Sequence, residues 1–343
     1  MLSLKRIAGM FPVGAVSGVR RLGGGITNDT FLVSAGRGMF VLQRLHGAFR
    51  PEVLADTEAV TARLALHGMR TPRLVRTTAD TLGYVSGREC WRMLTFVPGR
   101  CYQEALSSGQ VRSSAELLGR FHRNLDGMEY RFAHRLAHFH DTEHVMRTLE
   151  RTLRGRRRDA VYAQMEPLAS AVLAGYEQVR GQCAGAPERI IHGDPKAANV
   201  RFDQTGQRAV ALLDLDTVGR NTVAVELGDA ARSWCNRAAE GDWRKARFDL
   251  NNFRALVAGY VRGADGAVDR SELDSVPHGV RTICLELAAR FITDAFRREY
   301  FKLDVRRYRD LGEQNAARAR SQVRLYRDLM AKHDAVERIV RSA

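Results

Sequence analysis

The chain has 343 residues, of which 45% are hydrophobic, and it carries 54 Lys and Arg against 39 Asp and Glu, a net charge of +15. This length allows two lobes with a sizeable core, and no apolar run approaches the ~20 residues that span a bilayer, which excludes a membrane protein. The five cysteines form no CxxC pair, and no Arg/aromatic RNA-binding signature accompanies the one dense basic run, RGRRRD, so we expect a cytoplasmic protein with free thiols and no nucleic-acid partner.

Residues 16–95 are predicted to form strands around one helix. The apolar runs TFLVS and MFVLQRL predict a hairpin with AGRG as its loop, preceded by a glycine-rich turn. The following stretch, PEVLADTEAVTARLALHG, has apolar residues at helical spacing, with Pro51 in its first turn and Gly68 at its end. Strand character returns in GYVSGRECWRMLTFVPG.

From about residue 103 the pattern becomes mostly helical. The run SSAELLGRFHRNLDGM is amphipathic, residues 140–182 continue as helix, and three or four helices are expected at the C-terminal end. Between them lie two short strand-and-loop segments rich in polar residues. The sequence therefore predicts an α+β fold of two lobes: a small β-rich lobe over residues 1–96 and a larger, mostly helical lobe over residues 97–343.

The first polar segment is IIHGDPKAANVRFD, residues 190–203. Phosphoryl transfer from ATP needs positioning, Mg²⁺ and a carboxylate that orients the acceptor, and kinases supply these from a loop of the form HxDxxxxN. Asp194 would orient the acceptor hydroxyl, Asn199 would hold a Mg²⁺ through its amide oxygen, and Lys196 is placed to touch the transferred phosphate. An HxD alone is a weak signal, but the Asn at this spacing strengthens it.

The second polar segment is AVALLDLDTVG, residues 209–219. Asp214 ends an apolar run and is the natural second Mg²⁺ ligand, because Mg²⁺ prefers hard oxygen donors. Asp216 could assist the metal or cap a turn. The simpler alternative for both segments is a capped turn and a strand that happens to end in Asp.

Two stretches of the N-terminal lobe are expected to bind the nucleotide. Backbone N–H groups of GGGITND, residues 23–29, could approach phosphates, and LTFVPG could bind adenine through backbone groups at a hinge. The residues expected to do so are Gly24, Gly25, Thr27 and Asn28, with Thr95 and Val97 at the hinge.

The strand FVLQRL lacks the lysine that usually pairs with the α- and β-phosphates. Arg44 is the candidate to replace it, with Gln43 on the opposite face of the strand. Glu58, on the following helix, could pair with Arg44, or it could be a solvated helix charge.

The motifs HGDxxxxN, LLDLD and ELGDAAR together resemble the aminoglycoside phosphotransferase and choline kinase superfamily, which has a protein-kinase-like fold. Within it the chain looks most like the N-acetylhexosamine 1-kinases. That closer resemblance is carried by FHDT (residues 139–142), RFITDAFRREYFK (290–302) and NAARARSQ (315–322). The resemblance implies ATP as donor, Mg²⁺, and the anomeric hydroxyl of a sugar as acceptor.

The resemblance also implies which residues contact the acceptor. They are Asp141, Asp229, Arg290, Asp294 and Tyr300. Simpler alternatives remain, because Arg290 and Asp294 could pair with each other along one helix. Likewise, Asp229 could cap its helix, and Tyr300 could be a core residue. His140 is expected to be a structural hydrogen-bonding residue.

Three functions are thus open. The first is a kinase for an N-acetylhexosamine-type sugar, and the second is an aminoglycoside, choline or homoserine phosphotransferase of the same superfamily. The third is a non-catalytic nucleotide- or nucleic-acid-binding protein, although all of Asp194, Asn199 and Asp214 are present. The net positive charge would repel a polycationic acceptor at long range, which favours a neutral one.

Overall fold

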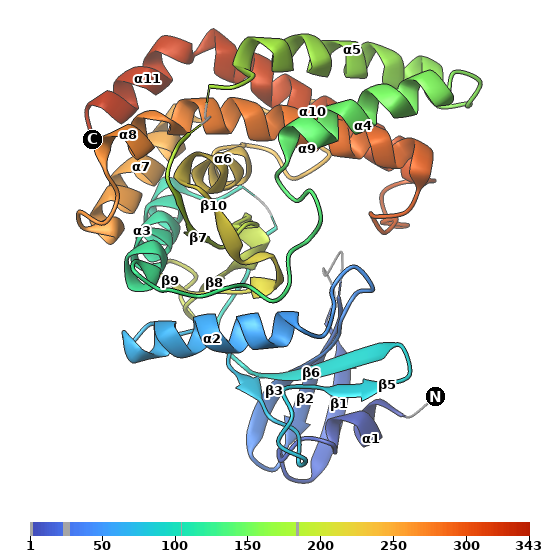
Figure 1. Cartoon of the computed structure of the whole chain (residues 1–343), viewed down its shortest axis with the longest axis vertical. Coiled ribbons are helices and arrows are strands. Elements are labelled where there is room, and N and C mark those ends of the chain that lie inside the picture. The colour runs from blue at the N-terminus through green and yellow to red at the C-terminus, as the bar shows by residue number, and fades with distance from the viewer. Residues whose placement is uncertain (1–2, 23–27, 104, 183–184) are drawn as a thin grey trace.

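The computed structural model describes residues 3–22, 28–103, 105–182 and 185–343. They form a small lobe built on an antiparallel sheet and a larger helical lobe (Figure 1). This confirms the two-lobed α+β architecture predicted from the pattern. Among the described helices, none combines the length and apolar composition needed to cross a membrane.

The sheet of the small lobe contains six strands, in the order β1-β2-β3-β6-β4, with β5 paired to β6. Its elements are α1 (Leu4–Ala8), β1 (Val16–Arg21), β2 (Asp29–Ala35), β3 (Gly38–Arg44), β4 (Leu74–Val75), β5 (Tyr84–Ser86) and β6 (Glu89–Thr95). The predicted hairpin is present as β2 and β3, with Ala35 opposite Gly38. Strand β6 then pairs with β3, so that Gln43 lies opposite Arg92.

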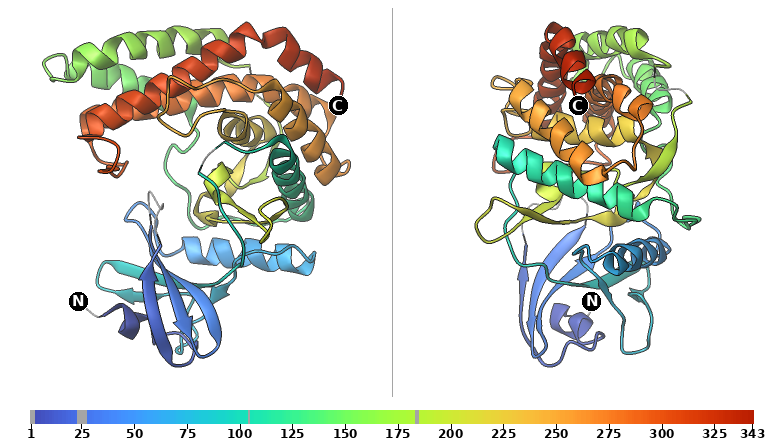
Figure 2. Two further views of the ribbon diagram at one scale, coloured as in Figure 1. Left: turned by 180° about the vertical axis from the view of Figure 1, so that it is seen from behind. Right: turned by 90° about the vertical axis from the view of Figure 1, so that its left-hand side faces the viewer.

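Helix α2 (Val53–Leu66) lies between the sheet and the larger lobe in every ribbon view (Figure 2). It begins two residues after Pro51, which therefore precedes the helix instead of lying in its first turn, whereas Gly68, with φ +68°, follows its end, as the sequence predicts. Val60 and Leu64 are buried in the hydrophobic core of the larger lobe.

A buried carboxylate, Asp56, fixes α2 to the larger lobe. It accepts hydrogen bonds from the backbone N–H groups of Ala133 and His134, both at 2.8 Å, and from the Tyr130 hydroxyl at 2.9 Å. Three donors satisfy the carboxylate in a place where an unpaired charge would be costly. Helix α2 is therefore joined to the helical lobe by both apolar and polar contacts.

The segment that links the lobes packs closely against the larger lobe at Gly99. This residue has φ +135°, and a Cβ atom there would lie 1.8 Å from the Phe202 carbonyl oxygen, so only glycine fits. The next residue, Arg100, exchanges two backbone hydrogen bonds with Phe202, at 2.9 and 2.8 Å.

The larger lobe contains nine helices and four short strands within the described residues. They are α3 (Ser108–Leu125), α4 (Thr142–Gly155), α5 (Tyr162–Val179), β7 (Glu188–Ile191), β8 (Val200–Phe202), β9 (Ala209–Leu212), β10 (Gly219–Thr222), α6 (Val223–Trp234), α7 (Leu250–Ala264), α8 (Arg270–Asp274), α9 (Val276–Arg297), α10 (Leu311–Ala331) and α11 (His333–Arg341). Six of the helices follow the second polar segment, where the sequence predicted three or four. The extra ones include the five-residue α8 and the nine-residue α11, which are too short for a clear periodic pattern.

Helix α9 runs through the centre of this lobe and packs against α4, α5, α6 and α10. Most of its residues are buried. The short strands lie on the side of the helices that faces the small lobe (Figure 1). Their loops carry the two polar segments into the space between the lobes.

Candidate active site

The first polar segment forms a loop after β7, which we call the HGD loop (residues 192–199). Glu226 of α6 accepts hydrogen bonds from the backbone N–H groups of His192, at 2.7 Å, and Gly193, at 2.9 Å. His140 bonds the Gly193 carbonyl oxygen at 2.8 Å. Gly193 adopts φ +82°, and a Cβ atom would lie 2.5 Å from the Thr217 carbonyl oxygen. The loop backbone is thus fixed on both sides.

Asp194 lies at the centre of this loop among three donors. Lys196 Nζ bonds its Oδ2, Asn199 Nδ2 donates to the same atom at 3.2 Å, and Arg232 Nη2 lies 3.9 Å from Oδ1. Burial alone would raise the pKa of Asp194, but Lys196 and Arg232 outweigh it and lower that pKa. The carboxylate is therefore ionised at neutral pH and can accept a hydrogen bond from an acceptor hydroxyl.

The second polar segment forms a turn after β9, which we call the DLD turn (residues 214–217). Asp214 has φ +63°, a conformation that non-glycine residues rarely adopt. Its carboxylate lines the same cavity as Asp194 and Lys196, and it accepts no hydrogen bond within the described part of the chain. Burial, together with the neighbouring Asp216, raises the pKa of Asp214 to about 6.

These groups fit a divalent cation. Asp214 offers an unpaired carboxylate, and Asn199 uses its Nδ2 on Asp194, which leaves its Oδ1 as a ligand. Hard oxygen donors of this kind suit Mg²⁺. The structure thus brings together the four residues to which the sequence assigned catalysis and metal binding.

Asp216 is engaged differently from either sequence-based alternative. Its carboxylate accepts hydrogen bonds from Arg92 Nη2 at 2.9 Å and from Asn28 Nδ2 at 2.7 Å. Both donors come from the small lobe. Asp216 therefore neither points freely toward a metal nor caps its own turn.

The predicted ion pair between Arg44 and Glu58 is wrong. Arg44 binds Asp29 at 2.5 Å and Glu89 at 2.7 Å, while Glu58 lies 3.7 Å from Arg73. Successive side chains of a strand point to opposite faces, so Arg44 faces away from its neighbour Gln43 and from the DLD turn.

The other expected nucleotide contacts stay predictions. Gly24, Gly25 and Thr27 lie outside the described residues. Thr95 is bound to the chain before β4, through its backbone N–H to Arg73 at 2.9 Å, and Val97 is buried.

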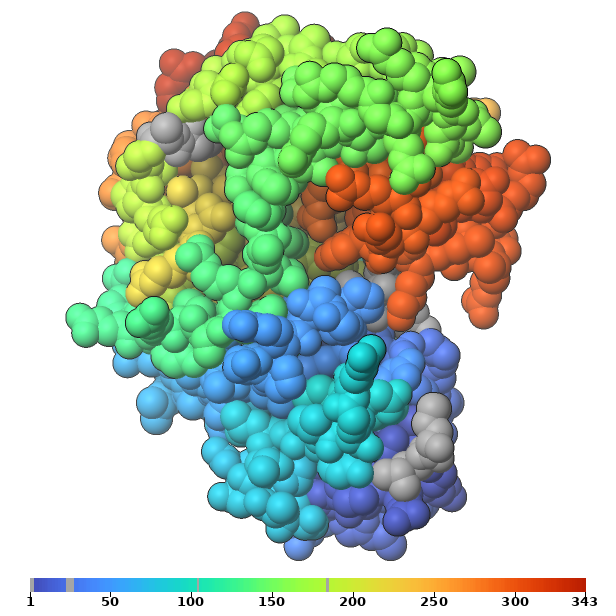
Figure 3. Space-filling model, turned by 45° about the vertical axis from the view of Figure 1, so that its right-hand side comes forward, coloured from blue at the N-terminus to red at the C-terminus, as the bar shows by residue number. Residues whose placement is uncertain are grey.

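The cavity above the HGD loop has a volume of about 90 Å³ and is bounded by α6, α9 and the segment after α9. Figure 3 shows a recess between the green segment that leads into α4 and the orange segment near the end of α9. One side of the cavity, which we call the aromatic wall, consists of Phe139, Arg290, Tyr300 and Phe301. The Arg290 guanidinium lies 5.4 Å from the Phe139 ring centre and 5.2 Å from that of Tyr300. It is held by two aromatic faces rather than by an ion pair with Asp294.

Asp294 has a supporting position. It accepts backbone hydrogen bonds from Glu299 at 3.0 Å, Tyr300 at 2.8 Å and Phe301 at 3.2 Å, and one from Asn315 Nδ2 at 3.1 Å. It therefore shapes the turn that presents Tyr300 to the cavity.

Asp229 lines the cavity, as the resemblance implies. Its Oδ1 binds Arg232 Nη2 at 2.7 Å, and its buried Oδ2 has no partner among the described residues. Burial raises the pKa of Asp229. The helix-cap alternative is excluded, because Thr222 caps α6.

Asp141, by contrast, does not line this cavity. Its Oδ1 caps α4 by accepting from the His144 N–H at 3.0 Å, and its Oδ2 lies 2.9 Å from His138 Nδ1. These three side chains are close enough to hold a metal ion, but the two imidazole rings stack in parallel, 3.5 Å apart, and Asp141 is already engaged.

Sequence reasoning missed three residues that shape the site: Arg92, Glu226 and Arg232. Glu226 and Arg232 lie within the motif ELGDAAR, from which only Asp229 was selected. Arg92 had a signal of its own, because it is a charged residue in the apolar strand ECWRMLTF, and charged residues are buried almost only when paired.

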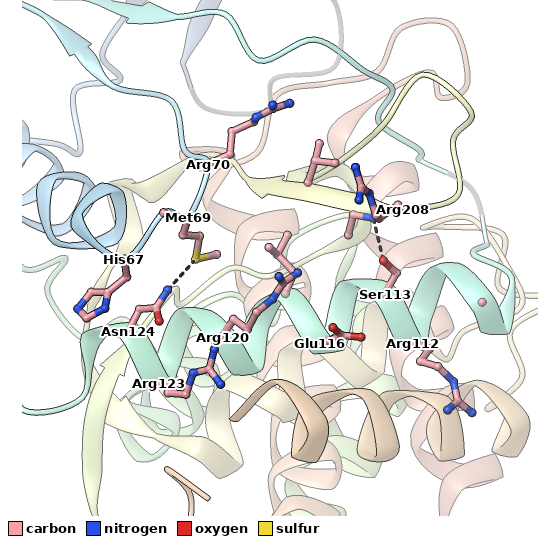
Figure 4. Close-up of a pocket in the computed structure, with 15 residues that line it drawn as sticks. His67, Met69, Arg70, Arg112, Ser113, Glu116, Arg120, Arg123, Asn124 and Arg208 are labelled. Carbon is pink, nitrogen blue, oxygen red and sulfur yellow. Dashed lines mark hydrogen bonds between the residues drawn. The ribbon is translucent and has the colours of Figure 1, made fainter. Parts of the chain in front are cut away.

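A second cavity, of about 650 Å³, lies along α3 beside the end of α2 and the β8–β9 turn (Figure 4). Arginines dominate its lining, namely Arg70, Arg112, Arg120, Arg123 and Arg208. No residue of the HGD loop or the DLD turn lines it. The chemistry therefore belongs to the smaller cavity.

The chain is similar in sequence and in fold to known phosphotransferases. A model described as the phosphotransferase enzyme family matches residues 18–265. The chain is 23% identical to a homoserine kinase of Sinorhizobium medicae over 75% of this chain and 74% of that protein. It is 24% identical to a homoserine kinase of Caulobacter sp. over 80% of each. The crystal structure of an aminoglycoside phosphotransferase from Alicyclobacillus acidocaldarius superimposes with a TM-score of 0.64 at 16% identity, covering 98% of this chain and 97% of that one. This likeness confirms the predicted fold.

Proposed function

The chain belongs to the phosphotransferase enzyme family, and from this premise we propose that it transfers the γ-phosphoryl group of ATP to a hydroxyl group of a small molecule. The observation that carries the proposal is the convergence of Asp194, Lys196 and Asp214 on one cavity. Bound Mg²⁺ would neutralise phosphate charge there. Because ATP is the donor, we propose a cytoplasmic location.

Each residue of the site has a defined task in this proposal. Ionised Asp194 orients the acceptor hydroxyl and receives its proton, which a loose transition state releases late. Lys196, held by Asp194, lies beside the transferred group as a point charge. Asn199 and Asp214 hold the metal.

For the acceptor, we propose a neutral N-acetylated hexosamine phosphorylated at its anomeric hydroxyl. Apart from Asp214, which is assigned to the metal, three carboxylates of the cavity are matched by cations: Asp194 by Lys196, Asp229 by Arg232 and Glu286 by His140. A neutral polyhydroxyl molecule suits such a cavity better than a multiply charged one. The anomeric hydroxyl is also the most acidic of a sugar, which eases its transfer.

The aromatic wall supports a sugar for a second reason. Tyr300 and Phe139 hold Arg290 between their rings, and Arg290 offers several N–H donors to adjacent hydroxyls. Asp229 Oδ2, which has no partner among the described residues, can accept from a further hydroxyl.

A second candidate acceptor is homoserine. The two curated relatives reported above are homoserine kinases, and the unpaired Asp229 Oδ2 could receive an ammonium group as well as a hydroxyl. In that case Arg290 would bind the substrate carboxylate.

A screen of ATP consumption with purified protein tests both candidates. The panel should contain N-acetylglucosamine, N-acetylgalactosamine, homoserine, choline and an aminoglycoside, followed by phosphorus NMR of the product. We expect turnover of an N-acetylhexosamine and a product with the phosphate on the anomeric oxygen. Turnover of homoserine alone would replace the first candidate by the second, and phosphate on a 3- or 6-hydroxyl would refute the anomeric assignment.

A further inference from the structure

A buried polar cluster joins the two lobes next to the metal ligands. We call it the Asp216 clasp, and it consists of Asn28, Gln43 and Arg92 from the small lobe and Asp216 from the larger one. The side chains of Arg92 and Asp216 are 2% and 1% exposed, and the guanidinium binds both carboxylate oxygens. Asn28 adds a third bond to the same carboxylate, at 2.7 Å.

Gln43 fixes the orientation of the arginine. Arg92 Nε donates to Gln43 Oε1 at 2.8 Å, and Gln43 Nε2 donates to Thr30 Oγ1 at 3.1 Å. The two side chains are neighbours because residues 43 and 92 are opposite each other in the β3–β6 register. The planar guanidinium therefore has fixed partners at Nε, Nη1 and Nη2, an arrangement that an ammonium group cannot reproduce.

The clasp also restrains the DLD turn. Asp216 stands two residues after Asp214, and the following Thr217 donates through Oγ1 to the His192 carbonyl oxygen at 2.9 Å. The turn is thus bound to the HGD loop on one side and to the small lobe on the other. Within the described residues, no hydrogen bond or ion pair holds the Asp214 carboxylate, and its backbone adopts the unfavourable φ +63° conformation.

We propose that Arg92 is a positioning residue: through Asp216 it holds the DLD turn so that the Asp214 carboxylate faces the metal–nucleotide complex, and it thereby couples closure of the lobes to metal binding. Strand β3 lacks the lysine that usually pairs with the α- and β-phosphates, and its Arg44 is bound to Asp29 and Glu89. The basic side chain that reaches the DLD turn from the small sheet is instead Arg92 of β6. The proposal rests on the proposed function, because it assumes a metal–nucleotide ligand.

Calorimetric titration with ADP, with and without Mg²⁺, tests this role without any acceptor. In the wild-type protein Mg²⁺ should strengthen ADP binding. Arg92→Met should reduce the Mg²⁺ gain, which is the ratio of ADP affinity with Mg²⁺ to that without it, about 10- to 100-fold. This is the usual effect of losing a group that orients a metal ligand. ADP affinity without metal should stay the same. Arg92→Lys should not restore the gain.

Arg189→Met is the matched control. Arg189 forms another bidentate pair with a buried carboxylate, at 2.6 and 2.8 Å from Glu272, and it touches neither the DLD turn nor the small lobe within the described residues. Its loss should lower the melting temperature but leave the Mg²⁺ gain intact.

The double variant Arg92→Met/Asp216→Leu separates positioning from folding. The single variant leaves the buried Asp216 carboxylate without its arginine, whereas the double variant removes both charges. The melting temperature should therefore be higher in the double variant than in the single one, while the Mg²⁺ gain stays lost. A gain that returns together with stability would overturn the proposal, as would an equal loss of ADP affinity without metal, which would mean direct contact with the nucleotide. A wild-type protein that binds ADP no better with Mg²⁺ would overturn the proposed function itself.

Discussion

The floor of the cavity and its aromatic wall are built in contrasting ways. The floor, formed by the HGD loop and the DLD turn, consists of charged groups whose backbone is held by buried partners such as Glu226. The wall consists of aromatic faces and one arginine, brought together from residues 139 and 290–301. The contrast teaches that the reaction and the choice of acceptor are separable: the floor should govern turnover, and the wall should govern acceptor binding.

The largest effect should come from the centre of the floor. Asp194→Ala removes the group that receives the acceptor proton, and we expect turnover to fall about 100- to 10,000-fold while ATP binding changes little. Steady-state kinetics and an ATP titration check both parts. Turnover within tenfold of the wild type would break the assignment of Asp194.

The next effect concerns the metal ligands of the floor. Asp214→Asn and Asn199→Ala should each raise the Mg²⁺ concentration needed for half-maximal activity by about 10-fold or more, because each removes a ligand oxygen or its charge. Activity measured across a Mg²⁺ series tests this expectation. Unchanged titration curves in both variants would refute the two-ligand interpretation.

A smaller effect is expected from the wall. Arg290→Ala should raise the acceptor KM about 10- to 100-fold. A hydrogen bond to a charged group contributes about 1.5–3 kcal/mol, and the loss of that free energy of binding corresponds to this range. The KM for ATP should hardly change. If the KM for ATP rises instead, Arg290 belongs to the nucleotide side and the separation of floor and wall fails.

The smallest effect concerns His140, which joins floor and wall. Its Nδ1 lies 3.0 Å from Glu286 of α9, and its Nε2 lies 2.8 Å from the Gly193 carbonyl oxygen. Because both partners are hydrogen-bond acceptors, both nitrogens can donate only when the imidazole is protonated. Burial alone would lower the pKa of His140, but Glu286 outweighs it and raises that pKa.

A raised histidine pKa has a defined sign in the pH dependence of stability. The stabilisation that protonated His140 gives the folded protein is complete below its pKa in the unfolded chain, about 6.5. It is lost as the pH rises through the higher pKa of the folded protein. The free energy of unfolding in urea should therefore differ most between wild type and His140→Gln near pH 6, and the difference should shrink toward alkaline pH. A constant difference would show that the ring is not charged.

The floor could be predicted from the sequence and the wall only in part. Asp194, Lys196 and Asn199 lie within six residues, so their spacing alone brings them together. Arg92 and Asp216 are 124 residues apart, and no local pattern pairs them. The error at Arg44 has the same origin, because which of two neighbouring strand residues faces the site depends on the register with β6.

The wall shows the same limit. The motif RFITD suggested that Arg290 and Asp294 act together, and their helical spacing allowed a pair. The aromatic rings that hold Arg290 come from the 139 region and from the turn after α9, and Asp294 serves that turn's backbone. Only the folded chain reveals these partners, since they depend on tertiary packing.

The attachment of α2 has a mechanical consequence. Asp56 and the buried residues Val60 and Leu64 tie this helix to the larger lobe, although its sequence lies within the N-terminal 96 residues. The same helix also packs against the small lobe, because its Val53 and Leu54 share a hydrophobic cluster with Leu45 and with Cys90 of β6. Helix α2 therefore couples the two lobes, and a change in the angle between them should be resisted by α2 as well as by the Gly99 contact and the Arg92–Asp216 pair.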